Sequence, residues 1–292
     1  MQCEVIRKWL GRKGLTLTKN IAIVTGAASG IGRAIAIRLS SEYVLINIDI
    51  NADGLHSLEG EIRNNNSTSY SIVGDVSQRK IHSEARKLAE SIGTLRSWVN
   101  CAGWTRSAAL HDFPENPEVF EELIGANQNG TFWGCAEAVN YFVSNKIKGS
   151  IVNISSVHGR RAWRDHAVYE MTKGAVDALT RNVAVTYGPY GIRCNAVAPG
   201  AVMTPALERS IVVAPNPQAR KSALEELTPL RRIADPAEIA EVVAFLVSEK
   251  SSYVSGQSLA VEGAWTSALG VIDLHPDLAI RYGLDPTRGS HL

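Results

Sequence analysis

Residues 21–40 read IAIVTGAASGIGRAIAIRLS, and this stretch decides the fold. It opens with an apolar run that is typical of a buried strand. Gly26, Gly30 and Gly32 follow, and apolar residues then recur at the spacing of a helix. A strand, a glycine turn and the start of a helix expose backbone N–H groups at the positive end of the helix, where a pyrophosphate binds. The stretch therefore indicates a dinucleotide-binding unit, and an ordinary glycine-rich turn is the alternative.

The next predicted strand supports this interpretation because it ends in an acidic residue. Asp49 lies nineteen residues after Gly30. An acidic residue about 20 positions beyond the glycines accepts hydrogen bonds from the hydroxyls of an adenosine ribose. Its carboxylate also repels a 2′-phosphate, so the sequence predicts NAD in preference to NADP. Arg33 weakens this preference, since an arginine near the phosphate loop can accommodate a 2′-phosphate.

A tyrosine and a lysine at helical spacing form the candidate chemical centre. Tyr169 and Lys173 lie four residues apart in AVYEMTKGAVDAL, and the tyrosine follows Ser156 by thirteen residues. In a helix the two side chains lie on one face. An ammonium beside a phenol favours the phenolate and lowers a pKa that is normally about 10. The pair therefore predicts a general acid/base, although ordinary ion spacing on a helix gives the same pattern.

Taken in order, the motifs resemble those of the short-chain dehydrogenase/reductase family over about residues 19–266. They are Thr25-Gly26-x-x-x-Gly30-x-Gly32, Asp75-Val76, Asn100-x-Ala102-Gly103, Asn127, Ser156, Tyr169-x-x-x-Lys173 and Pro199-Gly200-x-x-x-Thr204. Cys101 and Glu262-Gly263-Ala264 depart from the residues that are usual in the family. Neither departure removes a catalytic group, so the resemblance implies an NAD-dependent enzyme that acts on CH–OH groups.

Strand patterns alternate with helical patterns along the chain, which predicts an α/β fold with a doubly wound parallel sheet. The candidate strands are 21–25, 43–48, 70–74, 96–100, 150–155, 192–197 and 258–261. The resemblance implies a Rossmann-type sheet of seven parallel strands in the order 3-2-1-4-5-6-7, with helices on both faces. It also implies that helices at about 117–144 and 167–188 pack against a second subunit in a homodimer or homotetramer.

The two ends do not follow this pattern. We expect a single catalytic domain over residues 19–269, between an N-terminal extension of residues 1–18 and a C-terminal tail of residues 270–292. A mitochondrial transit peptide, a start-site extension and a solvated arm each fit the basic N-terminal segment.

The resemblance assigns a role to each catalytic candidate. Tyr169 would accept the proton of a substrate hydroxyl, and Ser156, with Ser155 as its competitor, would hydrogen-bond the same oxygen. Lys173 would lower the pKa of the tyrosine and hold the nicotinamide ribose, and Asn127 would position a water beside that lysine. The implied cofactor contacts are Gly26, Ser29, Gly30, Ile31, Gly32, Asp49, Ile50, Asp75, Val76, Asn100, Ala102, Gly103, Tyr169, Lys173, Pro199, Gly200, Val202 and Thr204.

The segment VHGRRAWRDHAV between the serine and the tyrosine is rich in basic residues, and it borders the substrate in the family. Arginines at this edge can bind a carboxylate, sulfonate or phosphate with two hydrogen bonds. A solvated surface or a subunit contact is the alternative. The predicted substrate contacts are Trp104, Arg106, Ser156, His158, Arg164 and Tyr169. The proline-containing segment 201–232 is predicted to form a lid over the substrate.

Composition excludes several other classes of protein. The chain has 292 residues, of which 45% are hydrophobic, and a formal net charge of +1. This is sufficient for one large core, and the charge argues against a nucleic-acid partner. No apolar run approaches the roughly 18 residues of a membrane span. The four cysteines, Cys3, Cys101, Cys135 and Cys194, lack metal-site spacing. We therefore expect no metal, free thiols and a cytoplasmic location.

Three functions compete at this stage. The first is an NAD-dependent dehydrogenase of carbohydrate metabolism that oxidises a polar secondary alcohol, such as a sugar, sugar acid or polyol, including an anionic one. The second is a ketoreductase that acts on a 3-oxoacyl group or a secondary-metabolite ketone. The third is a dinucleotide-binding regulator without turnover, against which the intact set of catalytic residues argues.

Overall fold

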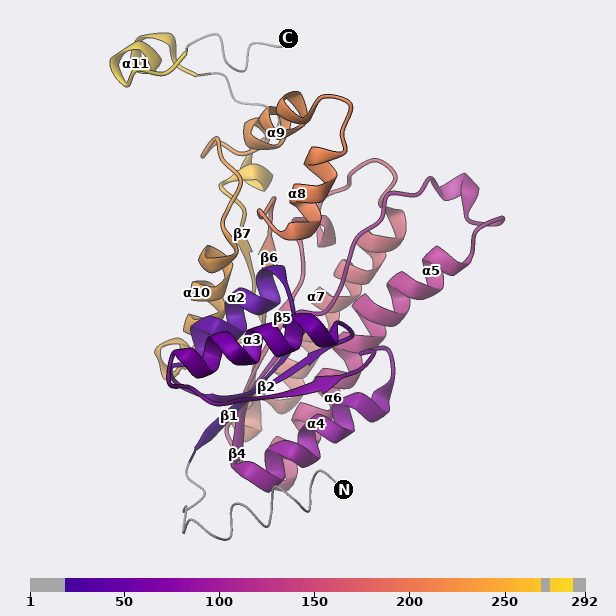
Figure 1. The fold of residues 1–292 in the computed structure, drawn as a ribbon, viewed down its shortest axis with the longest axis vertical. Coiled ribbons are helices and arrows are strands. Elements are labelled where there is room, and N and C mark those ends of the chain that lie inside the picture. Colours follow the sequence, from indigo (N-terminus) through magenta and orange to yellow (C-terminus); the bar gives the residue numbers. More distant parts are fainter. Residues whose placement is uncertain (1–18, 269–273, 286–292) are drawn as a thin grey trace.

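A computed structural model describes residues 19–268 and 274–285. Its described residues form a seven-stranded parallel sheet in the order β3-β2-β1-β4-β5-β6-β7, as predicted (Figure 1). The strands are β1 (Asn20–Thr25), β2 (Val44–Asp49), β3 (Ser69–Val73), β4 (Thr94–Asn100), β5 (Ser150–Ile154), β6 (Arg193–Pro199) and β7 (Ser258–Val261). The N-terminal extension predicted at residues 1–18 lies outside the described residues.

Helices connect the strands and cover the sheet. They are α2 (Gly30–Leu39), α3 (Ala52–Asn64), α4 (Arg79–Ile92), α5 (Glu118–Leu123), α6 (Gly130–Ser144), α7 (Ala167–Tyr187), α8 (Pro205–Val212), α9 (Pro217–Glu226) and α10 (Pro236–Val247). A π-helix, η2 (Ile124–Asn129), joins α5 to α6, so the predicted helix at 117–144 is one helical segment with a π-turn inside it. The predicted helix at 167–188 is α7.

The core consists of two apolar layers, one on each face of the sheet. Ile21 and Ile23 of β1 pack with residues of α4, α6 and α7, whereas Ala22 and Val24 pack with residues of α2, α3 and α10. Figure 1 shows α3 on one side of the sheet and α4 and α6 on the other. Both faces of a central parallel strand are buried, which explains why β1 is continuously apolar in sequence. Burial of one such isoleucine contributes about 1.5–3 kcal/mol.

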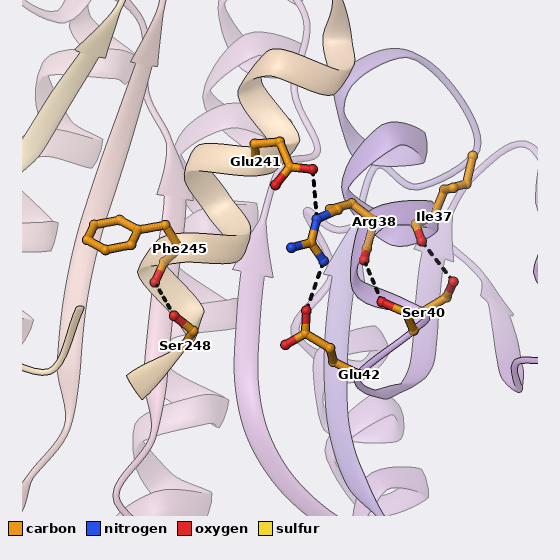
Figure 2. Close-up of polar contacts among 8 residues, drawn as sticks. Ile37, Arg38, Ser40, Glu42, Glu241, Phe245 and Ser248 are labelled. Carbon is orange, nitrogen blue, oxygen red and sulfur yellow. Dashed lines mark hydrogen bonds and ion pairs between the residues drawn. The ribbon is translucent and has the colours of Figure 1, made fainter. Parts of the chain in front are cut away.

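Ion pairs lie at the solvent-exposed edge of the contact between α2 and α10. Arg38 of α2 donates from Nε to Glu241 of α10 at 2.8 Å and from a terminal nitrogen to Glu42 at 2.9 Å (Figure 2). These groups are exposed, so each ion pair contributes at most about 1 kcal/mol. The buried apolar faces, including Ile35 and Ile239, therefore provide most of the stability of this contact.

The segment that was predicted to form a lid, residues 201–232, contains two helices. Pro205 and Pro217 begin α8 and α9, with Thr204 and Asn216 as the capping residues before them. Proline fits the first turn of a helix because its missing N–H would have no partner there. Within the predicted C-terminal tail, residues 274–285 are described and contain α11 (Pro276–Arg281).

Candidate active site

The glycine loop after β1 has the geometry that a bound pyrophosphate requires. Gly26 and Gly30 have φ angles of +69° and +55°, in the left-handed region that favours glycine. A Cβ on Gly32 would lie 2.0 Å from the carbonyl oxygen of Gly26, so no other residue fits. The side chain of Ser29, the residue before α2, makes no capping hydrogen bond to the helix. The first N–H groups of this helix therefore fit an anionic ligand.

Asp49 lies at the end of β2, directly beside this loop. Its Oδ2 accepts a hydrogen bond from the N–H of Ala28 at 3.0 Å, and its Oδ1 accepts one from the N–H of Asn51 at 2.9 Å. Ile50, the next residue, leaves 73% of its surface exposed. The carboxylate is thus fixed at the carboxyl edge of the sheet, where an adenosine ribose binds in dinucleotide folds.

Arg33 of α2 is bonded to groups of α3. Its guanidinium donates to the carbonyl of Gly54 at 3.3 Å, to Oγ of Ser57 at 3.2 Å and to Glu61 at 2.7 Å. All three partners belong to α3, so the charge of Arg33 is already paired. An arginine that is already paired is less free to bind a 2′-phosphate.

The ends of β3 and β4 continue the same edge. Val76 is buried and Asp75 is exposed, its carboxylate accepting from the N–H of Ser77 at 2.8 Å. The N–H groups of Cys101 and Ala102 both donate to Oγ1 of Thr25 at 3.0 Å, which ties the turn after β4 to β1. These contacts place the turn beside the glycine loop, where a Cβ on Gly26 would lie 2.7 Å from Cα of Ala102.

Asn100 and Cys101 stand where β4 leads into this turn. The side chain of Asn100 is buried and bonded to Trp98 and Asn153, so it is turned into the sheet rather than toward a cofactor. Burial raises the pKa of the Cys101 thiol to about 12. This cysteine is therefore a neutral thiol near pH 7 and adds no nucleophile to the site.

The segment after β6 completes the cofactor edge. The N–H of Gly200, which follows Pro199, donates to the carbonyl of Val261 at 3.1 Å. Val202 is buried and pairs with Ala234. A Cβ on Gly30 would lie 3.1 Å from Cγ2 of Thr204, so this segment closes over the glycine loop. The side chain of Ile31 contacts the core on the α2 side of the sheet.

Ser156, Tyr169 and Lys173 come together between β5 and α7. Tyr169 and Lys173 occupy the first two turns of α7, and Ser156 begins the 3-10 turn η3 (Val157–Gly159) after β5. Nζ of Lys173 donates to the carbonyl of Ile154 at 2.8 Å and lies 5.6 Å from the centroid of the Tyr169 ring. A hydrogen bond to Ser156 lowers the pKa of Tyr169 in part.

The two candidate serines are separated by their contacts. The hydroxyl of Ser155 donates to the backbone carbonyl of Lys173 at 3.3 Å. This hydrogen bond ties the end of β5 to α7. Oγ of Ser156 accepts from the N–H of His158 at 3.2 Å and shares a hydrogen bond with the tyrosine. Ser156 is therefore the serine in contact with the candidate general base.

The electrostatics of the pair differ from the sequence-based expectation. Burial raises the pKa of Tyr169 above its ordinary value of 10.0, more than the hydrogen bond to Ser156 lowers it. Burial also lowers the pKa of Lys173 to about 8, opposed by the negative charge of Asp177. The lowering of the tyrosine pKa by the lysine that the sequence predicts is not among the causes acting on Tyr169 in this arrangement. Nζ of Lys173 donates to the Ile154 carbonyl and lies 5.6 Å from the centroid of the tyrosine ring.

Asn127 lies at the centre of the π-helix and is completely buried. Its Oδ1 accepts from the N–H of Trp104 and its Nδ2 donates to the carbonyl of the same residue, both at 2.9 Å. Nδ2 also contacts Oγ1 of Thr172 at 3.3 Å. A Cβ on Gly103 would lie 2.8 Å from Oδ1 of Asn127 and 3.7 Å from Nζ of Lys173. The amide thus fixes the turn after β4 beside the lysine; its role in holding a water stays a prediction.

Aromatic rings, rather than arginines, surround Tyr169. The ring of His158 lies 5.8 Å from the tyrosine ring, and that of His166 lies 6.4 Å away. Arg164 points into solvent, with 92% of its side chain exposed, and pairs with its neighbour Asp165 at 3.5 Å. Arg106 and Trp104 are exposed on the turn after β4.

Three further residues, Trp163, Trp265 and Glu170, join this cluster and were not predicted from the sequence. Trp163 stands inside the basic segment that was considered for substrate binding, so its composition could have identified it. Trp265 follows β7, 96 residues after Tyr169, and only the sheet order brings it near. Glu170 accepts from the N–H of Trp163 at 2.5 Å and fixes the loop.

Two negative findings concern the described part of the chain. Nowhere in it do three or more His, Cys, Asp or Glu residues gather as a metal site. In the same residues, no helix combines the length and the apolar composition that crossing a membrane demands.

A parallel sheet with a glycine-rich phosphate loop, an acidic residue at the end of β2 and a Ser-Tyr-Lys centre defines a nicotinamide-dependent oxidoreductase. Comparisons with known proteins agree. Residues 26–266 match a family model described as Enoyl-(Acyl carrier protein) reductase. Glucose 1-dehydrogenase 2 of Bacillus subtilis (strain 168) is 35% identical over 254 residues, which cover 86% of this chain and 96% of that protein.

Solved structures show the same fold. The crystal structure of levodione reductase has a TM-score of 0.80 at 30% identity, covering 87% of this chain and 100% of that chain. An actinorhodin polyketide ketoreductase with NADPH has a TM-score of 0.80 at 26% identity, covering 87% and 99%. The chain belongs to the short-chain dehydrogenase/reductase family, and the predicted membership is confirmed. It is an oxidoreductase that acts on CH–OH groups with a nicotinamide dinucleotide.

Proposed function

We propose that this protein is an NAD-dependent dehydrogenase of a polar secondary alcohol, such as a sugar, sugar acid or polyol. The observation that carries the proposal is the contact of Ser156 with Tyr169 at the carboxyl edge of the sheet, above Lys173. The relative named glucose 1-dehydrogenase, similar over nearly its whole length, supports a polar alcohol as substrate.

The geometry supports a division of work between these residues. In oxidation, Tyr169 accepts the proton of the substrate hydroxyl and Ser156 holds the same oxygen by a hydrogen bond. The dinucleotide, when bound, supplies the hydride acceptor. Lys173 keeps a positive charge beside the tyrosine ring and, in this proposal, meets the nicotinamide ribose. Arg106 and Arg164, which are both exposed, are candidates to meet an anionic group of the substrate.

The choice of NAD depends on Asp49. Its two oxygens face the glycine loop and the start of α3, where a ribose 2′-phosphate would lie beside a negative charge. Arg33, in the first turn of α2 after the loop, is paired with Glu61. Both observations favour an unphosphorylated ribose.

A ketoreductase is the second candidate. The same groups serve the reverse reaction, with Tyr169 donating the proton, and the similar polyketide ketoreductase is described with NADPH. Levodione reductase, also similar, is named for the reductive direction. A regulator without turnover is a weaker candidate, because Ser156, Tyr169 and Lys173 are brought together in contact.

We also propose a homodimer or homotetramer in the cytoplasm. Unpaired thiols at Cys101, Cys135 and Cys194 favour a reducing compartment. Oligomer formation is supported by exposed apolar residues on α6, among them Phe132 and Val143.

The Tyr169→Phe variant tests the proposed chemistry. It removes only the hydroxyl, so NAD binding should stay nearly intact while turnover falls by about 10²–10⁴-fold. Steady-state rates with a panel of sugars, sugar acids, polyols and ketones, and NAD binding by fluorescence titration, give the two readouts. Near-normal kcat in this variant would remove Tyr169 from the mechanism. Best turnover in the reductive direction with NADPH would favour the ketoreductase.

A further inference from the structure

Five aromatic rings form one connected cluster that includes the candidate general base. Tyr169 lies edge-on to both His158 and His166, whose rings stack on each other at 5.7 Å with an interplanar angle of 12°. The ring of Trp265 meets His158 at 6.1 Å, and Trp163 meets Trp265 at 6.0 Å, both edge to face. The cluster therefore extends from the tyrosine to two tryptophans.

The basic residues of the same loop face other parts of the molecule. Arg160 donates to the carbonyl of Ser258 at 3.2 Å and pairs with the buried Asp177 at 3.6 Å. Arg161 donates to the carbonyl of Thr266 at 3.5 Å. Two of the arginines thus fasten the loop to β7, to α7 and to the segment after β7. The guanidinium groups of these two arginines therefore bind other parts of the protein. Trp163 of the same loop, in contrast, leaves 41% of its surface exposed.

One histidine of the cluster, His158, presents a neutral ring. Burial and the neighbouring His166 lower the pKa of His158, so this imidazole is neutral near pH 7. Its Nδ1 is buried without a hydrogen-bond partner and lies 3.8 Å from Glu170. That carboxylate is bonded instead to the N–H of Trp163. The side of Tyr169 that faces His158 and His166 is therefore lined by aromatic rings, and the nearer of the two, His158, is neutral.

Trp265 joins this cluster to the segment proposed to face the nicotinamide. It stands in the 3-10 turn η6 (Trp265–Ser267), where the N–H of Thr266 donates to Glu262 at 2.6 Å. A Cβ on Gly200 would lie 3.4 Å from Cε3 of the indole. The indole thus lies between Gly200 on one side and His158 on the other, at the end where hydride transfer would occur.

Aromatic side chains favour ligands with a flat face of C–H groups, because such a face buries apolar area against the ring. We infer that the substrate is a cyclic alcohol or ketone, and that Trp163 and Trp265 select it by contact with the face of its ring. This inference rests on the proposed function and narrows its substrate class. An open-chain alcohol of the same size covers less of an indole and loses more rotational freedom on binding.

Matched pairs of secondary alcohols test the inference. We compare kcat/KM for cyclohexanol with 3-hexanol, and for myo-inositol with mannitol, each with NAD. The wild type should prefer the cyclic member of the better-used pair by about 10-fold or more. Trp265→Leu and Trp163→Leu should reduce this ratio several-fold, and Trp265→Phe should keep most of it. Trp133→Leu, which removes an indole on α6 outside the cluster, should leave the ratio unchanged.

Equal losses on cyclic and open-chain alcohols in the leucine variants would overturn the inference, as would a wild-type preference for the open chain. Failure of the proposed function has a different signature, namely no turnover of any alcohol or ketone with NAD or NADP. Saturation-transfer NMR with cyclohexanol then decides the inference without turnover. The ring protons should receive saturation from the wild type and not from the Trp163→Leu/Trp265→Leu double variant; equal saturation in both would also overturn it.

Discussion

Lys173 is nearly fully buried, and its pKa determines which group of the site loses a proton first as the pH rises. Burial disfavours the ammonium and brings the lysine pKa to about 8, while burial of Tyr169 raises the phenol pKa. The proton that is lost most easily on raising the pH is therefore the one on the lysine. The two groups are close enough to be titrated as a coupled pair.

This balance predicts opposite pH profiles for the two directions. Oxidation needs a pair that accepts a proton, so its kcat/KM should rise as the pH passes about 8. Reduction needs a pair that donates one, so its kcat/KM should fall over the same range. Lys173→Arg keeps the charge to far higher pH and should remove the step near pH 8. Profiles of the same shape in both directions would rule out this pair as the proton carrier.

Asp49 supports a prediction about cofactor choice. Asp49→Ala removes the proposed acceptor of the ribose hydroxyls, so kcat/KM with NAD should fall roughly 10- to 100-fold and the gap to NADP should narrow. Adding Glu61→Gln frees Arg33 from its ion pair and should improve NADP further. Glu61→Gln alone is the control and should change little with NAD. An unchanged ratio between the two cofactors in Asp49→Ala would contradict the assignment.

From the sequence, the candidate chemical residues were easier to predict than their surroundings. Ser156, Tyr169 and Lys173 were predicted because helical spacing and motif order are local signals, and their catalytic roles stay predictions. The pairing of Arg33 with Glu61 and the approach of Trp265 depend on elements that meet only in the folded chain. The direction in which Lys173 points was equally inaccessible, because a carbonyl of β5 determines it.

At the scale of elements, two glycines give a matched test of the loop geometry. Gly32→Ala places a Cβ against the carbonyl of Gly26, whereas a Cβ on Gly60 in α3 meets no atom within 4 Å. Gly60→Ala should therefore stabilise the protein by about 0.4–1 kcal/mol through helix propensity. Gly32→Ala should abolish the thermal stabilisation by NAD. Thermal unfolding with and without NAD measures both, and a Gly32→Ala protein that NAD stabilises as well as the wild type would refute the close approach.

The strands were predicted more accurately than the helices of the substrate side. Each of the seven predicted strand ranges overlaps an observed one, because runs of buried apolar residues are a strong signal when both faces of a sheet are covered. Strand ends moved by one or two residues, as at β6, which continues to Pro199. Helices α8 and α9 were not predicted, because short helices that begin at proline resemble loops in sequence.

At the scale of the whole molecule, the outer surface of α6 and α7 is the candidate subunit contact. A hollow of about 420 Å³ is lined by residues of both helices, among them Phe132, Val143, Leu179 and Tyr187. Of these, Phe132 and Val143 expose 47% and 43% of their surface. Large exposed apolar side chains grouped on one surface are typical of a subunit contact.

We therefore expect light scattering to show a dimer or tetramer for the wild type and a shift toward monomer for Phe132→Glu/Val143→Glu. A charge buried at such a contact is costly without a partner. Leu110→Glu is the control, because Leu110 is 70% exposed and lies outside the hollow. A monomeric wild type, or a double variant with unchanged mass, would dismiss the proposed contact.

Because of the π-turn at Asn127, the segment from α5 to α6 should not tolerate the gain or loss of a residue. Buried positions recur every four residues through Val119, Leu123, Asn127, Thr131 and Cys135. On a regular α-helix, four residues overshoot a full turn by about 40°, so this series would wind away from the core within a few turns. The wider π-turn absorbs the excess. Loss of one residue there would turn α6 by about 100° relative to α5. Surface loops tolerate the insertion or deletion of a residue, but the π-turn should not. A change of length there would misalign α6 with α5, and with it both the candidate active site and the outer surface of α6.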